Sequence, residues 1–250
     1  MPASPPYAED GEEAAAIEAA AFAYGVRLPA GAAGRLAVHG RLVREAARTT
    51  NLTTILEPAA MRVRHVLDSL LPLAIWPEAV ATPGGAVDMG SGAGYPGLPL
   101  VLAGAAAEAV LVDATRRKVE FLDSVCATVG APARAMWGRA EDLAGRMPAR
   151  ERVWARAVGP LPVLVELAFG MLARAGVVVC WKGPEARGAE GAAGEAACRA
   201  LGGEPLGMRT YSLPEGAGER TLFAYRRGEG ALPRGVPRAP AVIRRRPLGP

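Results

Sequence analysis

Apolar residues in the first third of the chain recur at helical spacing. An alanine-dominated pattern predicts a helix over 12–24, and a second helix is expected over about 34–48. After a turn at 51–54, a third helix is expected over 58–75. Residues 1–11 are small and proline-rich, which predicts disorder. The N-terminal third is therefore expected to form a helical cap on the rest of the chain.

From about residue 85 the pattern changes to short apolar runs that alternate with helical segments. This alternation is typical of a doubly wound α/β fold, in which helices cover both faces of a parallel sheet. The predicted strands are 86–89, 109–113, 133–137, 153–158 and 177–181, and the predicted helices are 115–129, 160–172 and a glycine- and alanine-rich stretch that ends near 201.

The stretch Ala86–Pro99 stands out, because an apolar run ends in an acid and is followed by glycines at alternate positions. It predicts a buried strand that turns sharply into a helix. Gly90, Gly92 and Gly94 allow dihedral angles that a Cβ forbids, and they let a ligand lie against bare backbone. Pro96 suits the first helical turn, and we expect the helix N-terminus to face the ligand with free N–H groups.

Glycines alone do not identify the ligand, because Gly92–Gly97 also fits the dinucleotide pattern G-x-G-x-x-G. Asp88 separates the two interpretations. Its carboxylate, two residues before Gly90, would repel a pyrophosphate but hold an ammonium group, directly or through water. The pattern D-x-G-x-G-x-G is typical of Rossmann-like methyltransferases that use S-adenosylmethionine, a ligand with an ammonium group and no phosphate. A nicotinamide or flavin site is the alternative.

Further candidates lie at the carboxyl ends of other strands, where open α/β sheets bind their ligands. Asp113 follows Gly90 by 23 residues, close to the offset at which an acid meets ribose hydroxyls in a nucleoside site. The alternative for Asp113 is an N-cap of the helix that begins near Thr115, and one carboxylate can do both. Ala140 and Glu141 leave the third strand where an adenine edge would lie, although an acid at a helix start needs no ligand.

The net charge of +4 is unevenly distributed along the 250 residues. From Arg226 onward there are seven arginines and one acid, Glu229, so this end carries about +6 and the rest about −2. A proline-rich arginine tail suits a phosphate backbone, and its binding should weaken as salt rises. A disordered, solubilising terminus is the alternative.

Composition narrows the class of protein further. Half of the residues are apolar, yet no uninterrupted apolar run approaches the length of a membrane span. The first residues lack the charged and apolar regions of a signal peptide. Cys126, Cys180 and Cys198 are odd in number and far apart, which suggests neither disulfides nor a zinc site. We expect a cytoplasmic monomer with no membrane partner and no metal.

Seven short motifs occur in order: Asn51–Thr53, His65–Leu70, Asp88–Pro99, Val112–Lys118, Gly138–Glu141, Ala155–Val158 and Trp181–Pro184. Together they resemble the signature of the RsmG (GidB) family, the bacterial 16S ribosomal RNA guanine-N7 methyltransferases, over residues 34–248. The resemblance implies a Rossmann-like, seven-stranded, mostly parallel sheet, in which 206–213 and 221–226 form a closing antiparallel hairpin. It also implies methyl transfer from S-adenosyl-L-methionine to a guanine in the decoding-region loop of the small ribosomal subunit, with S-adenosyl-L-homocysteine as product.

The resemblance also assigns roles to residues. Substrate-side roles fall on basic residues, and Lys182 and Arg139 are the catalytic candidates; for Lys182, a solvated strand end is the alternative. For Arg156, scaffolding by an ion pair is the alternative to a ligand role. Gly159 and Pro160 depart from the family's usual alanine after the fourth strand. The implied cofactor contacts are Gly90, Tyr95, Asp113, Ala114, Thr115, Ala140, Glu141 and Arg156, beside Asp88, Gly92 and Gly94 of the glycine pattern; other basic substrate-side positions are Arg116, Arg117 and Lys118.

The implied chemistry agrees with the small number of candidate bases. Guanine N7 carries a lone pair and no proton, so attack on the sulfonium methyl needs no general base, and catalysis is mainly in-line alignment. His39 and His65 lie on helices outside the predicted sheet, and Cys180 lies within a strand. His65 and Asp68, three apart on one helix, predict a structural hydrogen bond rather than a catalytic pair.

We divide the chain into a helical cap (1–80), a methyltransferase core (81–227) and a basic tail (228–250). Two other functions stay open. One is an NAD-dependent oxidoreductase that uses the same glycine loop, and the other is a non-catalytic RNA-binding relative that keeps the cofactor pocket.

Overall fold

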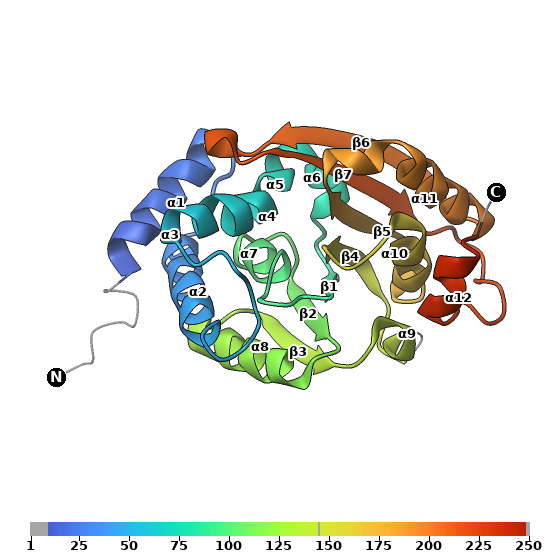
Figure 1. Ribbon diagram of the computed structural model, residues 1–250, viewed down its shortest axis with the longest axis horizontal. Coiled ribbons are helices and arrows are strands. Elements are labelled where there is room, and N and C mark those ends of the chain that lie inside the picture. Colours follow the sequence, from blue (N-terminus) through green and yellow to red (C-terminus); the bar gives the residue numbers. More distant parts are fainter. Residues whose placement is uncertain (1–9, 145, 249–250) are drawn as a thin grey trace.

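The computed structural model describes residues 10–144 and 146–248 and contains one seven-stranded sheet (Figure 1). The strands are β1 Gly85–Met89, β2 Glu108–Asp113, β3 Ala133–Trp137, β4 Arg150–Arg156, β5 Leu172–Lys182, β6 Glu204–Ser212 and β7 Glu219–Arg226. Their order is β3-β2-β1-β4-β5-β7-β6, and β7 pairs antiparallel with both β5 and β6. The predicted doubly wound fold and its closing hairpin are confirmed. Of residues 1–11, which were expected to be disordered, 1–9 lie outside the described residues; for Gly11 the expectation is wrong, because α1 begins there.

Helices cover both faces of the sheet. In β2, Ala109 and Leu111 pack into one apolar cluster with α1, α2, α7 and α8, whereas Val110 and Val112 pack into the other with α10, α11 and α12. Strands buried on both faces read as continuous apolar runs, as the sequence showed. The helical elements are α1 Gly11–Ala23, α2 Ala32–Ala46, α3 Pro58–Met61, η2 Arg62–Leu67, α4 Asp68–Leu70, α5 Pro72–Ile75, α6 Pro77–Val80, α7 Gly97–Leu102, α8 Arg116–Val129, α9 Ala140–Leu143, α10 Leu161–Phe169, η3 Pro184–Arg187, α11 Ala189–Ala200, η4 Pro214–Gly216 and α12 Pro240–Arg245.

The strand order places a ligand crevice at one edge of the sheet. From β1 the chain moves outward to β2 and β3, and it then returns to the other side of β1 to form β4. At such a switch point the loops beyond the carboxyl ends of β1 and β4 diverge and leave room for a ligand. The loop after β1 is the predicted glycine-rich loop.

Some element boundaries differ from the prediction. The single helix expected over 58–75 is a series of short helices that includes a π-helical segment, η2. The strand expected over 153–158 begins at Arg150 and ends at Arg156. Its first residues are polar, so its extension depends on pairing with neighbouring strands and leaves no apolar signal. No helix in the described ranges is long and apolar enough to cross a membrane.

The C-terminal residues 228–248 pack onto the protein. Ile243 of α12 is fully buried, and α12 contacts α10. Arg238 forms an ion pair with Glu166 of α10. The alternative of a disordered terminus is therefore wrong for these residues. The division of the chain at residues 80 and 227 stays a prediction, although one apolar cluster joins the N-terminal helices to the sheet.

A stack of three rings ties α2 to the glycine-rich loop. The Tyr95 ring lies between His39 and His65, at centroid distances of 4.6 and 4.7 Å. His39 Nε2 lies 2.7 Å from the carbonyl oxygen of Ala93, an acceptor, so Nε2 carries the proton and donates it. Burial lowers the pKa of both imidazoles to about 4. The stack therefore holds two neutral histidines.

We predict that His39 makes the folded state sensitive to acid. Its pKa is lowered from 6.5 to about 4, so its contribution to stability is present above pH 6.5 and is lost as the pH falls through 4. A difference of this size is worth roughly 3 kcal/mol. Replacing His39 by glutamine, whose amide can still donate to Ala93, should flatten the pH dependence of the unfolding free energy, measured by urea denaturation between pH 6.5 and 4.

Asp88 has the opposite effect on the pH dependence of stability, because burial raises the pKa of its carboxyl to about 6. Protonation of this carboxyl favours the folded state as the pH falls. Its contribution is present in both proteins and cancels when wild type and His39→Gln are compared. Parallel curves for the two proteins would show that His39 is not the acid-sensitive group.

Candidate active site

The glycine-rich loop between β1 and α7 has its backbone N–H groups turned into the protein. The N–H groups of Gly90 and Ser91 both donate to the carbonyl oxygen of Val112 at 2.9 Å. The N–H of Gly92 donates to Asp113 Oδ2 at 3.0 Å. The loop is therefore fastened to the end of β2, and its shape is fixed before any ligand binds.

All three predicted glycines are required: at Gly94, φ is +97° and a Cβ would lie 2.6 Å from a methyl group of Leu98. Gly90 and Gly92 are required for different reasons. Gly90 has φ +77°, and a Cβ there would lie 2.5 Å from a methyl group of Val158. Gly92 also has a positive φ, +59°, but its Cβ position faces open space, with Gly90 O at 3.9 Å as the nearest atom. The backbone at Gly92 is therefore left bare on the side of the loop where a ligand can approach.

The structure corrects the position expected for Asp88. Its side chain is fully buried beneath the loop, where Oδ2 accepts from Ser91 Oγ at 2.6 Å and from the N–H of Gly97 at 2.9 Å. Oδ1 is also buried and has no hydrogen-bond partner in the described residues. Asp88 thus caps the loop and α7 from within and lines none of the three cavities at the carboxyl edge of the sheet.

The N-terminus of α7 likewise does not present the free N–H groups that we expected to face the ligand. Pro96 precedes the helix as its N-cap, the N–H of Gly97 is bound by Asp88, and the N–H of Leu98 donates to Gly94. Pro99 has no N–H, and Leu100 donates to Pro96. The first turn of α7 has no free donor for a phosphate, which weighs against the dinucleotide alternative.

Three adjoining cavities follow the carboxyl edge of the sheet. The first, here called the β2–β3 cavity, has a volume of about 420 Å³ and contains Asp113, Ala114, Ala140 and Glu141 in its lining. These are four of the predicted cofactor residues, brought together from the ends of two strands. Apolar side chains from β1, β2 and α10 form much of the remaining wall. The cavity is a partly apolar slot with two carboxylates.

Asp113 stands between the first cavity and the second. Its carboxylate is nearly buried and accepts from Gly92 through Oδ2 and from the N–H of Thr115 through Oδ1, at 2.8 Å. The N-cap alternative is wrong in detail, because Thr115 is the N-cap of α8 and Asp113 accepts from the N–H of that residue. Two carboxylate oxygens offer about four acceptor sites, so capacity for a ligand hydroxyl remains.

The second, or glycine-loop, cavity has a volume of about 410 Å³ and is lined by Gly90, Gly92, Tyr95, Lys118 and Arg156, among others. It shares Gly90, Asp113 and Val158 with the first cavity. Gly94 and Thr115, also predicted to bind the cofactor, lie outside both linings. They shape the loop and begin α8 instead.

The third, or arginine, cavity has a volume of about 480 Å³ and shares His65, Arg156 and Ala157 with the glycine-loop cavity. Four cationic and two acidic side chains line it, so its field is positive. They are Arg64, Arg156, Lys182 and Arg220, with Asp68 and Glu185.

Asp68 is the centre of the polar network under this cavity. Its buried Oδ2 lies 3.0 Å from Arg156 Nη1 and 3.3 Å from Arg220 Nε. The Tyr211 hydroxyl donates to Oδ1 at 2.8 Å, and Trp181 Nε1 donates to the main-chain oxygen at 2.9 Å. Asp68 therefore joins the N-terminal helices to four strands, which sequence reasoning did not foresee. The scaffolding alternative for Arg156 is observed, and its side chain also borders two cavities.

His65 has a structural role, as predicted, but its main partners lie outside its own helix. Its Nδ1 lies 3.3 Å from a guanidinium nitrogen of Arg156, a donor, so Nδ1 accepts. Nε2 then carries the proton and donates to Thr53 Oγ1 at 2.9 Å. Both nitrogens of this histidine are occupied.

The two catalytic candidates lie in different places. Lys182 borders the arginine cavity, but its Nζ is held by Glu190 at 2.6 Å and by the carbonyl oxygen of Gly159 at 3.1 Å. Arg139 is exposed and borders the β2–β3 cavity. Among the other basic candidates, Lys118 lines the glycine-loop cavity, whereas Arg116 forms an exposed ion pair with Glu120.

Several lining residues were missed by the sequence analysis. Val163 and Leu167 of α10 belong to an apolar run that indicated only a core helix, and Ala239 and Ala241 come from the C-terminal residues. No local signal marks a small or aliphatic residue as a pocket wall, because such residues are equally common in the core.

Comparison with solved structures agrees on the fold. A branched-chain polyamine synthase mutein from Thermus thermophilus is similar with a TM-score of 0.54 and 17% identity, over 83% of this chain and 67% of that one. A methyltransferase from Pyrococcus furiosus is similar with a TM-score of 0.53 and 12% identity, over 78% of this chain and 96% of that one.

Sequence comparison gives closer relatives. The ribosomal RNA small subunit methyltransferase G of Symbiobacterium thermophilum is 36% identical over 243 residues, which cover 93% of this chain and 96% of that protein. The protein of the same name from Chloroflexus aggregans is 37% identical over 202 residues, 79% of this chain and 82% of that one. The family model GidB, described as rRNA small subunit methyltransferase G, matches residues 35–218. The chain therefore belongs to the rRNA small subunit methyltransferase G family.

Proposed function

We propose that this protein is an S-adenosylmethionine-dependent methyltransferase of ribosomal RNA, and more specifically that it methylates guanine N7 in the decoding-region loop of 16S RNA. The observation that carries the proposal is the row of three cavities, in which each neighbouring pair shares wall residues. Such a row suits a nucleoside cofactor at one end, a methyl group in the middle and a nucleotide at the other end.

The first two cavities fit the parts of the cofactor. The β2–β3 cavity offers an apolar slot for adenine, with Asp113 and Glu141 as acceptors for ribose hydroxyls or the amino group. The glycine-loop cavity offers bare backbone at Gly92 for the amino-acid part. When bound, the cofactor supplies an electrophilic methyl group on a sulfonium. The protein's part is to hold both ends so that this methyl faces the third cavity.

The arginine cavity suits a nucleotide with its phosphate. Four cationic side chains line it. The carboxylate of Asp68, which also lines it, accepts hydrogen bonds from Arg156, Arg220 and Tyr211. Guanine is proposed from the family resemblance, and the chemistry of its N7 agrees with the side chains present. N7 has a lone pair and no proton, so the reaction needs alignment rather than proton transfer.

The two histidines and Cys180 are unsuited to proton abstraction or nucleophilic attack. His39 and His65 are stacked on Tyr95 and hydrogen-bonded. Burial raises the pKa of Cys180 to about 12, and its thiol lies within β5. A thiol with such a pKa is not an activated nucleophile. These features favour a nucleophile that needs no activation.

The reaction is tested with labelled cofactor. Small subunits from a strain that lacks this protein, incubated with the enzyme and methyl-labelled S-adenosylmethionine, should incorporate label at one nucleotide. Borohydride–aniline cleavage should map the label to the decoding-region loop, and nuclease digestion should release 7-methylguanosine. Label on a pyrimidine carbon or an exocyclic amine would refute guanine N7. No label, despite binding of the cofactor, would support a non-catalytic RNA-binding protein.

Glu141 provides a direct test of the cofactor site, because no hydrogen bond or ion pair of its carboxylate is found in the described structure. Replacing Glu141 by glutamine should weaken binding of S-adenosylhomocysteine by about 10-fold or more, since a hydrogen bond to a charged acceptor is worth about 1.5–3 kcal/mol. Calorimetry measures the change.

Asp142→Asn, one residue further on the same helix and outside this cavity, is the matched control and should bind normally. Equal affinity of both variants would contradict the role of Glu141, and tighter binding of NAD would restore the dinucleotide alternative.

Trp137 adds a second part to the proposed RNA surface, in a hollow that shares Ala114, Gly138 and Arg139 with the β2–β3 cavity. It is 60% exposed at the end of β3, and its indole N–H donates to the carbonyl oxygen of Ala114 at 3.1 Å, which fixes the ring. Arg139 and Arg146 lie in the lining of the same shallow hollow. A fixed, exposed aromatic ring beside arginines suits stacking with an unpaired base and contact with its phosphate.

Tryptophan fluorescence tests this role of the ring. The other three tryptophans, Trp76, Trp154 and Trp181, are at most 4% exposed, so acrylamide quenching reports mainly on Trp137. Substrate RNA should protect this signal. Trp137→Ala should raise the KM for RNA by about 5- to 100-fold, since base stacking is worth about 1–3 kcal/mol. Trp137→Phe should retain most of the affinity, and both variants should bind S-adenosylhomocysteine normally. Unchanged quenching with bound RNA would exclude the contact.

A further inference from the structure

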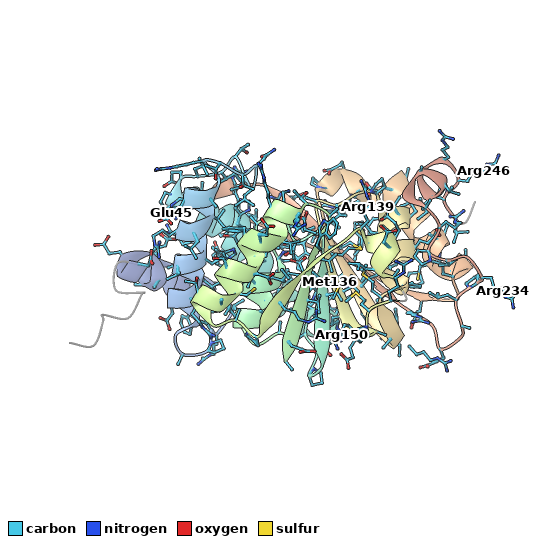
Figure 2. The ribbon with its side chains drawn as sticks, turned by 90° about the horizontal axis from the view of Figure 1, so that it is seen from below. Glu45, Met136, Arg139, Arg150, Arg234 and Arg246 are labelled. Atoms are coloured by element: carbon cyan, nitrogen blue, oxygen red, sulfur yellow. The ribbon has the colours of Figure 1, made fainter. Side chains whose placement is uncertain are left out.

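The C-terminal strap, residues 228–248, packs on the face of the sheet that α10 covers (Figure 1). Ile243 is fully buried there, and Leu232, Val236 and Leu248 are partly buried against the same apolar cluster. The strap is thus attached along its length. Arg234 and Arg246 extend from it away from the body of the protein (Figure 2).

Arg238 fastens the strap to α10. Glu166 is the single charged residue of the helix Leu161–Phe169 and is fully buried. Its carboxylate accepts from the Arg238 backbone N–H at 2.8 Å, from Nε at 2.9 Å and from Nη2 at 2.7 Å. Arg238 Nη1 also donates to the main-chain oxygen of Arg246, beyond α12. An unpaired carboxylate in this apolar setting is costly, so Glu166 strongly favours the docked strap.

The residues that come after this ion pair reach the β2–β3 cavity. Ala239 and Ala241 belong to its lining, together with Val163 and Leu167 of α10. Both strap residues are exposed and have small side chains, so the strap forms part of the cavity wall and leaves the space beside it free. A larger side chain at residue 239 would occupy space that a ligand needs.

We propose that the strap is a working part of the cofactor site: docked by Arg238 on Glu166, it supplies through Ala239 and Ala241 the wall that encloses the adenosine group. This inference rests on the proposed function. The basic tail expected from the sequence would act on RNA alone, and its removal before Arg234 would not separate the two roles, because the deletion also removes the cavity wall. Substitutions that keep the strap residues in the chain are needed.

Two variants act on different parts of the strap contact. Ala239→Leu fills the cavity from the strap and leaves the ion pair intact. Glu166→Leu removes the anchor but leaves α10 wholly apolar, which preserves the core. Val242→Leu, an apolar enlargement at a half-exposed strap position outside the cavity, is the matched control. Calorimetry with S-adenosylhomocysteine and limited trypsin digestion, followed by mass spectrometry of cleavage after Arg238, are the measurements.

Ala239→Leu and Glu166→Leu should each bind S-adenosylhomocysteine at least 10-fold more weakly, and Val242→Leu should bind like wild type. Glu166→Leu should be cut after Arg238 faster than wild type, and S-adenosylhomocysteine should slow this cut in wild type but not in Ala239→Leu. If wild type binds the ligand and both variants bind it equally well, the strap inference is wrong and the proposed function stands. If wild type binds none, both fall.

Discussion

The structure depends on how the end of β1 satisfies its own backbone. A strand that stops beneath a ligand leaves N–H groups with no neighbour in the sheet, and buried N–H groups must be paired. The N–H groups of Gly90 and Ser91 donate to the carbonyl oxygen of Val112. Two carboxylates hold the rest of the loop. Asp88 accepts from the Ser91 hydroxyl and from the N–H of Gly97 at the start of α7. Asp113 accepts from the N–H groups of Gly92 and Thr115. The loop is consequently preformed. The same pairing leaves no free donors for a pyrophosphate at α7, so the electrostatics favour a ligand without one.

The N-terminal helices are part of the site rather than a cover over it. Asp68 brings them into contact with side chains from β4, β5, β6 and β7, and the His39–Tyr95–His65 stack joins them to the glycine-rich loop. A buried carboxylate is stable only with good partners, and the planar guanidinium groups of Arg156 and Arg220 provide directed hydrogen bonds. The arginine cavity therefore exists only where these five elements meet. The arginines that give this cavity its charge are also the residues that join its elements, through their contacts with Asp68.

The sequence predicted the fold well because short segments of the chain carry the patterns that determine each strand and loop. Apolar runs gave five parallel strands, and glycines at alternate positions gave the loop and the edge of the sheet at which a ligand binds. Side-chain direction was predicted less well. Asp88 lies two residues after Ala86, and side chains at this spacing share a face of the strand, so Asp88 points toward the α7 side rather than to the open edge. The ion pair of Lys182 was not predicted, because its partner Glu190 lies on another element and charge pairing across elements leaves no local pattern.

The basic tail shows why a charge count does not predict a surface. Seven arginines suggested one role, yet Arg238 points inward while Arg234 and Arg246 point outward. The informative signal lay elsewhere, in the single glutamate of an otherwise apolar helix. A helix that is apolar all round is buried, and a buried carboxylate needs a cation. Because the apolar run of α10 contains no cation, the partner of Glu166 had to come from a distant segment. That segment is the strap, 72 residues further along the chain, and the same contact that neutralises Glu166 brings two alanines to the edge of the β2–β3 cavity.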